Sequence, residues 1–297
     1  MSIALLLLPD FLLIVVGAVL SRMRAFGAPF WSGAERLVYF VLFPALLFRS
    51  LATAAVSVAD SLSLIATGVA FTASGMVFSL LARFLFRMPQ RDFAACFQCG
   101  FRFNTYLALA VADRLQGARG IALISLLVGV LVPVVNVAAV GMLARHARGQ
   151  LLPVLARNPL VLACVAGLAW GAAGFTLPDT ANRVLANLGG ASLALGLLTV
   201  GAALKLERGD LPLPAMGYWT GLKLIAVPGV ALLAGRAFGL SGSDLQLAIV
   251  MAAVPTAPSA YVLATQMNAN GRPVAFLITA GTIAAAVTLP LWLAATA

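Results

Sequence analysis

Two prolines and two hydroxyl side chains interrupt an apolar stretch near the C-terminal end of the chain. Residues 250–266 read VMAAVPTAPSAYVLATQ, with Pro255, Thr256, Pro258 and Ser259 near the middle. A proline removes one backbone donor and clashes with the preceding turn, so this pair predicts an unwound helix. Open backbone inside a bilayer must be covered by protein or line a watery cavity. Secondary transporters bind substrate at such breaks, and we therefore predict a substrate site here.

A second apolar stretch, residues 92–112, carries Arg102, Asn104 and Thr105 at mid-membrane depth. A charge at the bilayer centre costs about 3 kcal/mol on insertion scales, so an arginine there normally faces a cavity or a partner. Asn and Thr offer both donors and acceptors, which suits a carboxylate, an ion or freed backbone. The alternative for Arg102 is a loop position or a side chain that snorkels to the surface.

Three further polar residues lie within apolar stretches. Lys223 is a second intramembrane cation, or else a lysine that snorkels to the surface. Asn136 follows Pro133 and either completes the polar site or adds packing polarity to a kinked helix. Asp10 follows Pro9 and is a proton or ion carrier, a counter-ion to Arg102 or Lys223, or an interfacial helix-start residue. Two cations and few buried acids favour an anionic substrate.

Apolar blocks fill almost the whole chain. It is 62% hydrophobic and 9% charged, whereas a soluble domain carries about 25% charged residues. The charges gather in short gaps between blocks of about 20 residues, the length that crosses a bilayer as a helix. We therefore predict an all-α polytopic membrane protein with ten transmembrane helices. They lie near residues 3–20, 35–52, 61–82, 92–112, 120–143, 154–172, 184–204, 214–234, 246–266 and 274–294.

The two halves of the chain share weak similarities at a common offset. NTYLALAV (104–111) corresponds to SAYVLATQ (259–266), and ARGIALIS (118–125) to GRPVAFLIT (271–279), at spacings of 155 and 153 residues. Each repeat holds five spans, and because five is odd the second copy is inverted in the membrane, as in many carriers. We predict one repeat over 1–148 and another over 149–297, with Asn104 at the place of Ser259.

Basic residues are distributed unevenly between the gaps. Odd-numbered gaps hold twelve Lys and Arg residues and even-numbered gaps hold five. Because cytoplasmic loops are enriched in Lys and Arg, the first gap is predicted to be cytoplasmic and both termini extracytoplasmic. The first 24 residues lack the basic start of a signal peptide, so we predict a retained first span. The expected location is the inner (plasma) membrane, with the chain crossing it many times.

Signatures of enzymes and metal sites are missing from the sequence. There is no H-E-x-x-H, no G-x-S-x-G and no phosphate-binding loop. Cys96 and Cys99 form C-x-x-C inside a predicted span, far from the single histidine, whereas a structural zinc site needs four ligands. We therefore expect no catalytic activity, no cofactor and no bound metal.

Four stretches, in this order, resemble bacterial members of the auxin efflux carrier family. They are FPALLFRSLA (43–52), FQCGFRFNTY (97–106), RNPLVLACVAGL (157–168) and AAVPTAPSAYVLA (252–264). Members carry small carboxylates such as malonate, malate or, in plants, auxin. Relatives commonly have a Gly-Leu-Pro-like break after the asparagine, but residues 107–111 read LALAV here. The residues themselves thus do not predict a break at Asn104.

The resemblance implies a fold like that of bile-acid symporters and antiporters. Two inverted five-helix repeats would bring broken, crossing helices four and nine together within a transport domain of spans three to five and eight to ten. Spans one, two, six and seven would form a scaffold, which is often a homodimer in the family.

The residues and the resemblance together favour a secondary transporter that moves small organic anions by alternating access. Two helix N-termini at the breaks would direct partial positive charge at the substrate carboxylate. The alternatives are a sodium-coupled bile-acid-type symporter, a cation–proton antiporter, or a channel or sensor. No nucleic acid partner is expected, and the coupling ion is left open between proton and sodium.

Overall fold

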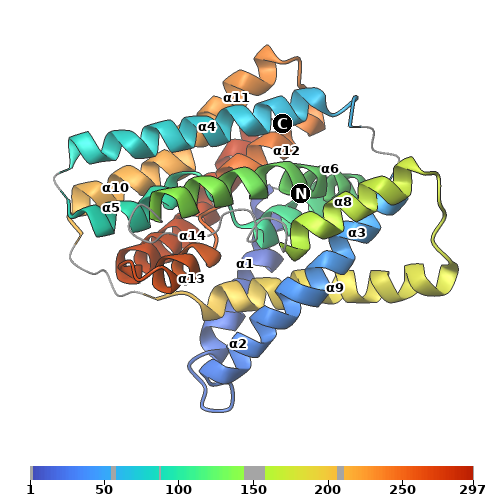
Figure 1. Cartoon of the computed structure of the whole chain (residues 1–297), viewed down its shortest axis with the longest axis horizontal. Coiled ribbons are helices and arrows are strands. Elements are labelled where there is room, and N and C mark those ends of the chain that lie inside the picture. The colour runs from blue at the N-terminus through green and yellow to red at the C-terminus, as the bar shows by residue number, and fades with distance from the viewer. Residues whose placement is uncertain (1–2, 55–57, 87, 144–157, 206–210, 297) are drawn as a thin grey trace. The chain divides into compact units, whose positions relative to one another are not determined.

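The computed structural model describes residues 3–54, 58–86, 88–143, 158–205 and 211–296, and all its regular structure there is helical. The helices are α1 (Ile3–Leu20), α2 (Ala28–Leu37), α3 (Phe43–Thr53), α4 (Leu62–Leu85), α5 (Gln90–Phe97), α6 (Thr105–Leu143), α8 (Pro159–Ala172), α9 (Asp179–Ala202), α10 (Leu213–Gly221), α11 (Val227–Ala237), α12 (Gly242–Ala253), α13 (Ser259–Gln266) and α14 (Gly271–Ala294). Figure 1 shows their course along the chain. The prediction of an all-α chain is confirmed for these residues.

Seven helical stretches of the described chain are long and apolar enough to cross a membrane, and α8 and α12 are shorter apolar helices. The longest stretch, Gln90–Leu143, has 54 residues. At 1.5 Å per residue it would measure about 80 Å as one helix, against about 30 Å for the bilayer core. It turns at Gly117, whose φ is 56°, a backbone conformation that glycine adopts without steric cost. The chain is thus a multi-pass membrane protein.

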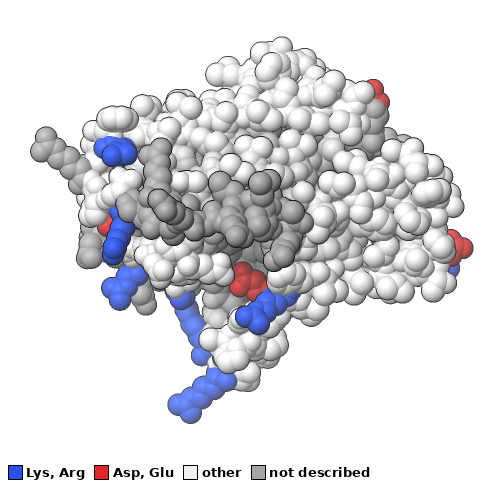
Figure 2. All heavy atoms as spheres, in the orientation of Figure 1, with Lys and Arg blue, Asp and Glu red and all other residues white. Residues whose placement is uncertain are grey.

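Apolar side chains also cover the outside of these helices. Phe84 is 82% exposed, Leu233 70% and Val287 63%. In Figure 2 the charged side chains stand in a few groups and leave broad surface areas without Lys, Arg, Asp or Glu. Such a surface is unusual for a soluble protein and matches a protein solvated by lipid.

The chain forms two compact units. The first comprises residues 1–62, 106–132 and 154–203, and the second comprises residues 63–105, 133–153 and 204–297. Each unit is therefore built from three separate segments of the chain. The predicted join between the halves, at residues 148 and 149, lies outside the described residues.

Glycines bring the helices of the first unit close together. In α1, a Cβ atom at Gly17 would collide with the backbone of Leu198 in α9, and one at Gly201 would collide with the backbone of Ile14. Close approach through small residues is typical of helix packing in membranes. Elsewhere in this unit α3 packs against α8, as Figure 1 shows.

The second unit holds α14 against several partners. It packs against α12 and α13, and in Figure 1 α13 lies beside α14. A π-helical turn, Leu222–Ala226, joins α10 to α11 and also contacts α14. The elements that build the candidate site belong to this second unit, except that α6 contributes only its first residue and its later part, from Pro133 on.

Candidate functional site

Two helical stretches of the second unit are interrupted near their middle. One stops at Ala253 and resumes at Ser259, as the two prolines between them predict. The other passes from α5 through a short 3₁₀ turn, Gln98–Gly100, and resumes as α6 at Thr105. The ninth predicted span is therefore broken, and so is the fourth, although residues 107–111 gave no signal for it.

The two interruptions run past one another in opposite directions. The backbone N–H of Asn104 donates to the carbonyl of Pro255 at 2.8 Å. Earlier in the fourth predicted span, the carbonyl of Cys99 accepts a hydrogen bond from Thr256 Oγ1, also at 2.8 Å. The Gln98 amide then reaches the carbonyl of Ala260 at 3.0 Å. Each interruption thus supplies partners for backbone groups that the other has freed, which a bilayer interior requires.

A glycine lets the interrupted fourth span pass close to a neighbouring helix. A Cβ atom at Gly100 would collide with the hydroxyl of Ser79 in α4, and one at Gly75 would lie 2.8 Å from the Gly100 carbonyl oxygen. The segment therefore passes directly against the backbone of α4. Gly100 inside an apolar stretch was a usable signal for a close approach, and the sequence reasoning missed it.

Arg102 lies buried at this crossing and joins three elements. Arg102 lies in the non-helical segment before Thr105 and is 6% exposed, so its side chain does not snorkel to the surface. Its Nη1 donates to Ser259 Oγ at 2.9 Å, where α13 begins, and its Nη2 donates to Asn136 Oδ1 in the later part of α6. A planar guanidinium can bind two oxygens at once in this way.

Lys223 lies in the π-helical turn and is 3% exposed, so the snorkelling alternative is wrong for it as well. Such turns are rare and often found at functional sites. Pro228 has no N–H for the carbonyl of Leu224 four residues earlier, and the indole of Trp292 donates to that carbonyl instead, at 2.8 Å. Lys223 belongs to this turn, and its ammonium group donates to the carbonyl of Ala252 near the end of α12.

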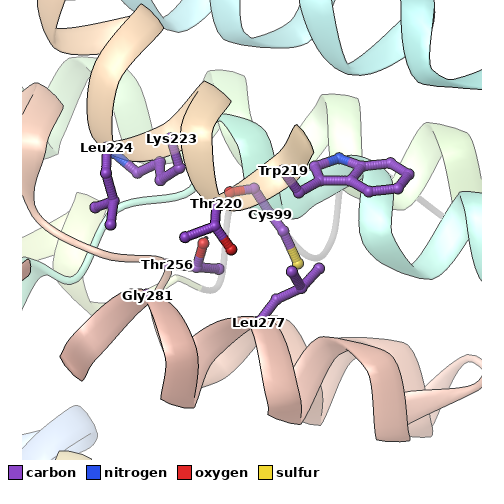
Figure 3. A pocket seen from close by; sticks show the side chains of 8 residues that line it. All are labelled: Cys99, Trp219, Thr220, Lys223, Leu224, Thr256, Leu277 and Gly281. Atoms are coloured by element: carbon purple, nitrogen blue, oxygen red, sulfur yellow. Dashed lines mark hydrogen bonds between the residues drawn. The ribbon is translucent and has the colours of Figure 1, made fainter. Parts of the chain in front are cut away.

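A small cavity lies between the π-helical turn, the two interruptions and α14. Its lining residues are Cys99, Trp219, Thr220, Lys223, Leu224, Thr256, Leu277 and Gly281, and Figure 3 shows their side chains. Thr220 and Thr256 both present hydroxyl groups to it. Its volume of about 10 Å³ is about the space of one water molecule. Sequence reasoning missed Thr220, although it lies one helical turn before Lys223.

The predicted site residues divide between the two units. Those gathered in the second unit are Arg102, Asn104, Thr105, Asn136, Lys223, Pro255, Thr256, Pro258 and Ser259. Among them, Thr105 is the first residue of α6, and Pro258 directly precedes α13. Asp10 belongs to the first unit and is 3% exposed. It lies 3.5 Å from the guanidinium of Arg114, which rather than Arg102 or Lys223 is its ion-pair partner.

Comparison with known proteins gave one family and one curated relative of note. Residues 143–293, just over half of the chain, match a family described as membrane transport protein. Auxin efflux carrier component 6 of Arabidopsis thaliana is 27% identical over 143 residues, which cover 46% of this chain and 25% of the plant protein. The aligned region thus spans a quarter of that relative's length. Both comparisons agree with the resemblance found in the sequence.

Proposed function

This chain belongs to the membrane transport protein family, that of the auxin efflux carriers, and on that premise we propose that it is a secondary transporter of small carboxylates. The family is one of transporters, in line with the expectation that the chain is not an enzyme. The substrate would be a small organic anion, and alternating access would carry it across the bilayer. The observation that carries this proposal is the buried guanidinium of Arg102 at the crossing of two broken helices.

The chemistry of the crossing suits a carboxylate. α6 begins at Thr105 and α13 at Ser259, and the N-terminus of a helix carries about +0.5 of an elementary charge. Two such ends and Arg102 concentrate positive potential where Asn104 and Thr256 offer polar groups. A carboxylate needs more room than the present cavity of about 10 Å³, so the proposal includes a rearrangement of the second unit around the crossing.

The overall arrangement that we propose has ten spans in two inverted repeats. Spans one, two, six and seven would form the scaffold, with spans three to five and eight to ten as the transport domain, and two copies of the chain would pair through the scaffold. The shared offset between the halves supports this arrangement, since the interruptions lie before Thr105 and before Ser259, 154 residues apart in the sequence.

Among the alternatives, a cation–proton antiporter would need a buried acid at the crossing. Asp10, the acid predicted to couple transport to protons or ions, lies in the other unit beside Arg114. Its coupling role stays a prediction. A channel would conduct without a rearrangement, and the crossing offers no wide passage, because the cavity there has the size of one water molecule.

Uptake into proteoliposomes tests the proposed function. We expect a panel of radiolabelled monocarboxylates and dicarboxylates to show saturable uptake of at least one small carboxylate, with mutual competition between those that bind. Amino acids, sugars and organic cations of similar size serve as controls. Equal permeation of all solutes without saturation would identify a channel and would contradict the proposal.

We also expect both ends of the chain to lie outside the cytoplasm. The three native cysteines are buried, so single cysteines introduced by Ser2→Cys and Thr296→Cys should dominate labelling. An impermeant maleimide should modify both positions in intact cells, whereas Gly27→Cys, in the predicted cytoplasmic first gap, should react only after permeabilisation. Protection of the two termini together with labelling at residue 27 would reverse the proposed orientation.

A further inference from the structure

The ammonium group of Lys223 lies at the end of a helix that the chain interrupts inside the membrane. Its side chain is 3% exposed and donates to the carbonyl of Ala252, one residue before the last residue of α12. No described carboxylate forms an ion pair with it. Its partner is therefore a neutral backbone oxygen, and its charge faces the helix terminus.

The end of α12 carries backbone carbonyl groups that lack N–H partners and that a cation would stabilise. The last four carbonyls of a helix lack intrahelical partners. Here Pro255 supplies no N–H to the carbonyl of Met251 in α12, nor Pro258 to that of Val254 just beyond the end of the helix. The C-terminus of a helix carries about −0.5 of an elementary charge. In a bilayer interior there is no bulk water to solvate it, so a cation or a hydrogen-bond donor at this position offsets part of the cost of burying these carbonyls.

The groups around Lys223 are those that a small metal cation would use. Thr220 and Thr256 line the adjoining cavity, and Thr256 also donates to the carbonyl of Cys99 at 2.8 Å. Hydroxyl and carbonyl oxygens are the ligands of hard cations. In secondary transporters generally, unwound carbonyls and half-helix C-termini coordinate sodium. Here the lysine ammonium, a compact point charge on a flexible stem, occupies such a position.

We propose that Lys223 is a tethered cation that takes the place of a coupling sodium ion at the end of α12, so that transport by this chain needs no sodium. The link to sodium-free transport rests on the proposed transporter function. Whether Lys223 or a sodium ion occupies the position beside Ala252 can be tested without any substrate. Pro228 and Trp292 have a positioning role, because they shape the π-helical turn that directs Lys223 inward.

The test measures sodium binding through the melting temperature of the purified chain. Sodium chloride replaces choline chloride at constant ionic strength, with no carboxylate present. We expect the wild-type melting temperature to stay constant. Lys223→Ala removes the ammonium and opens space beside Ala252, so sodium should raise the melting temperature saturably by about 5 °C.

Two variants serve as controls. Lys223→Met also removes the charge but refills the volume, so it should respond to sodium less than Lys223→Ala. Lys205→Ala removes another lysine of the second unit, whose ammonium lies 4.8 Å from the centre of the Tyr261 ring, and should not respond at all. A response in Lys205→Ala equal to that in Lys223→Ala would show a general salt effect and overturn the proposal.

Wild-type measurements keep the proposal testable if Lys223→Ala does not fold. A saturable stabilisation of the wild type by sodium, or carboxylate uptake that requires a sodium gradient, would overturn the tethered-cation role. Sodium-independent melting and uptake in the wild type support it. Failure of every carboxylate in the uptake panel would refute the proposed substrate class and leave the melting result intact, so the two failures are distinguishable.

Discussion

Replacing Pro255 and Pro258 together by alanine is expected to leave the chain inserted in the membrane and to abolish carboxylate uptake. Each change favours a continuous helix by about 3 kcal/mol and restores an N–H, for the carbonyl of Met251 in α12 or for that of Val254 just after it. A continuous helix through residues 254–258 would withdraw the Pro255 carbonyl from the N–H of Asn104, which now lies 2.8 Å away. The crossing, and the helix terminus that Lys223 contacts, would then be lost.

The measurement is uptake into proteoliposomes at matched protein content, with insertion checked by detergent-free fractionation. Pro290→Ala is the matched control, since Pro290 lies inside α14 without interrupting it. The control should retain uptake, which would separate loss of the break from a general effect of proline removal. Normal uptake by the double variant would show that the interruption is not part of the transport site.

Arg102→Gln is expected to weaken substrate binding about 100-fold and Arg102→Lys about 10-fold, because a hydrogen bond to a charged group contributes about 1.5–3 kcal/mol. Glutamine removes the charge, whereas lysine keeps it but lacks the planar fork. Binding can be measured by calorimetry with the best carboxylate of the uptake panel. The melting temperature of each variant, measured without ligand, reports separately on folding.

The competing role for Arg102 is structural. In that case its contacts with Ser259 and Asn136 hold the crossing together, and Arg102→Gln would lower the melting temperature while the remaining folded protein binds substrate normally. Arg49→Gln is a suitable control, because Arg49 also donates to an asparagine, Asn182 at 2.7 Å, within the first unit. It should leave substrate affinity unchanged. Unchanged affinity in Arg102→Gln would eliminate the anchor role.

The sequence predicted those parts of the site whose causes are local. Pro255 and Pro258 interrupt a helix through their own missing N–H groups, so the end of α12 at Ala253 and the start of α13 at Ser259 followed from the residues. The burial of Arg102 and Lys223 followed from the cost of charge in a bilayer, although alternatives remained open at that stage.

The break before Thr105 was not predicted, because Gly100, its local signal of a close approach, was missed and the contacts around the break involve residues elsewhere in the sequence. It depends on the passage of Gly100 against Ser79 and on the hydrogen bond from Asn104 to Pro255. The partner of Lys223 has a similar origin, since nothing local indicates that its side chain reaches a carbonyl 29 residues further on. The ion-pair partner of Asp10 could not be predicted for the same reason, because Arg114 lies far from it in the sequence.

The hydrogen bonds across the crossing also restrict how the second unit can move. Separating the interruptions would leave the freed groups of both without partners in a dry medium, at about 1–3 kcal/mol for each group. The N–H of Asn104 and the hydroxyl of Thr256 would lose these acceptors, whereas the amide of Gln98 would keep the carbonyl of Ala95. This cost favours a transport cycle in which the two interruptions move together. If the proposed alternating access holds, we expect the hinge or sliding surface to lie outside the crossing.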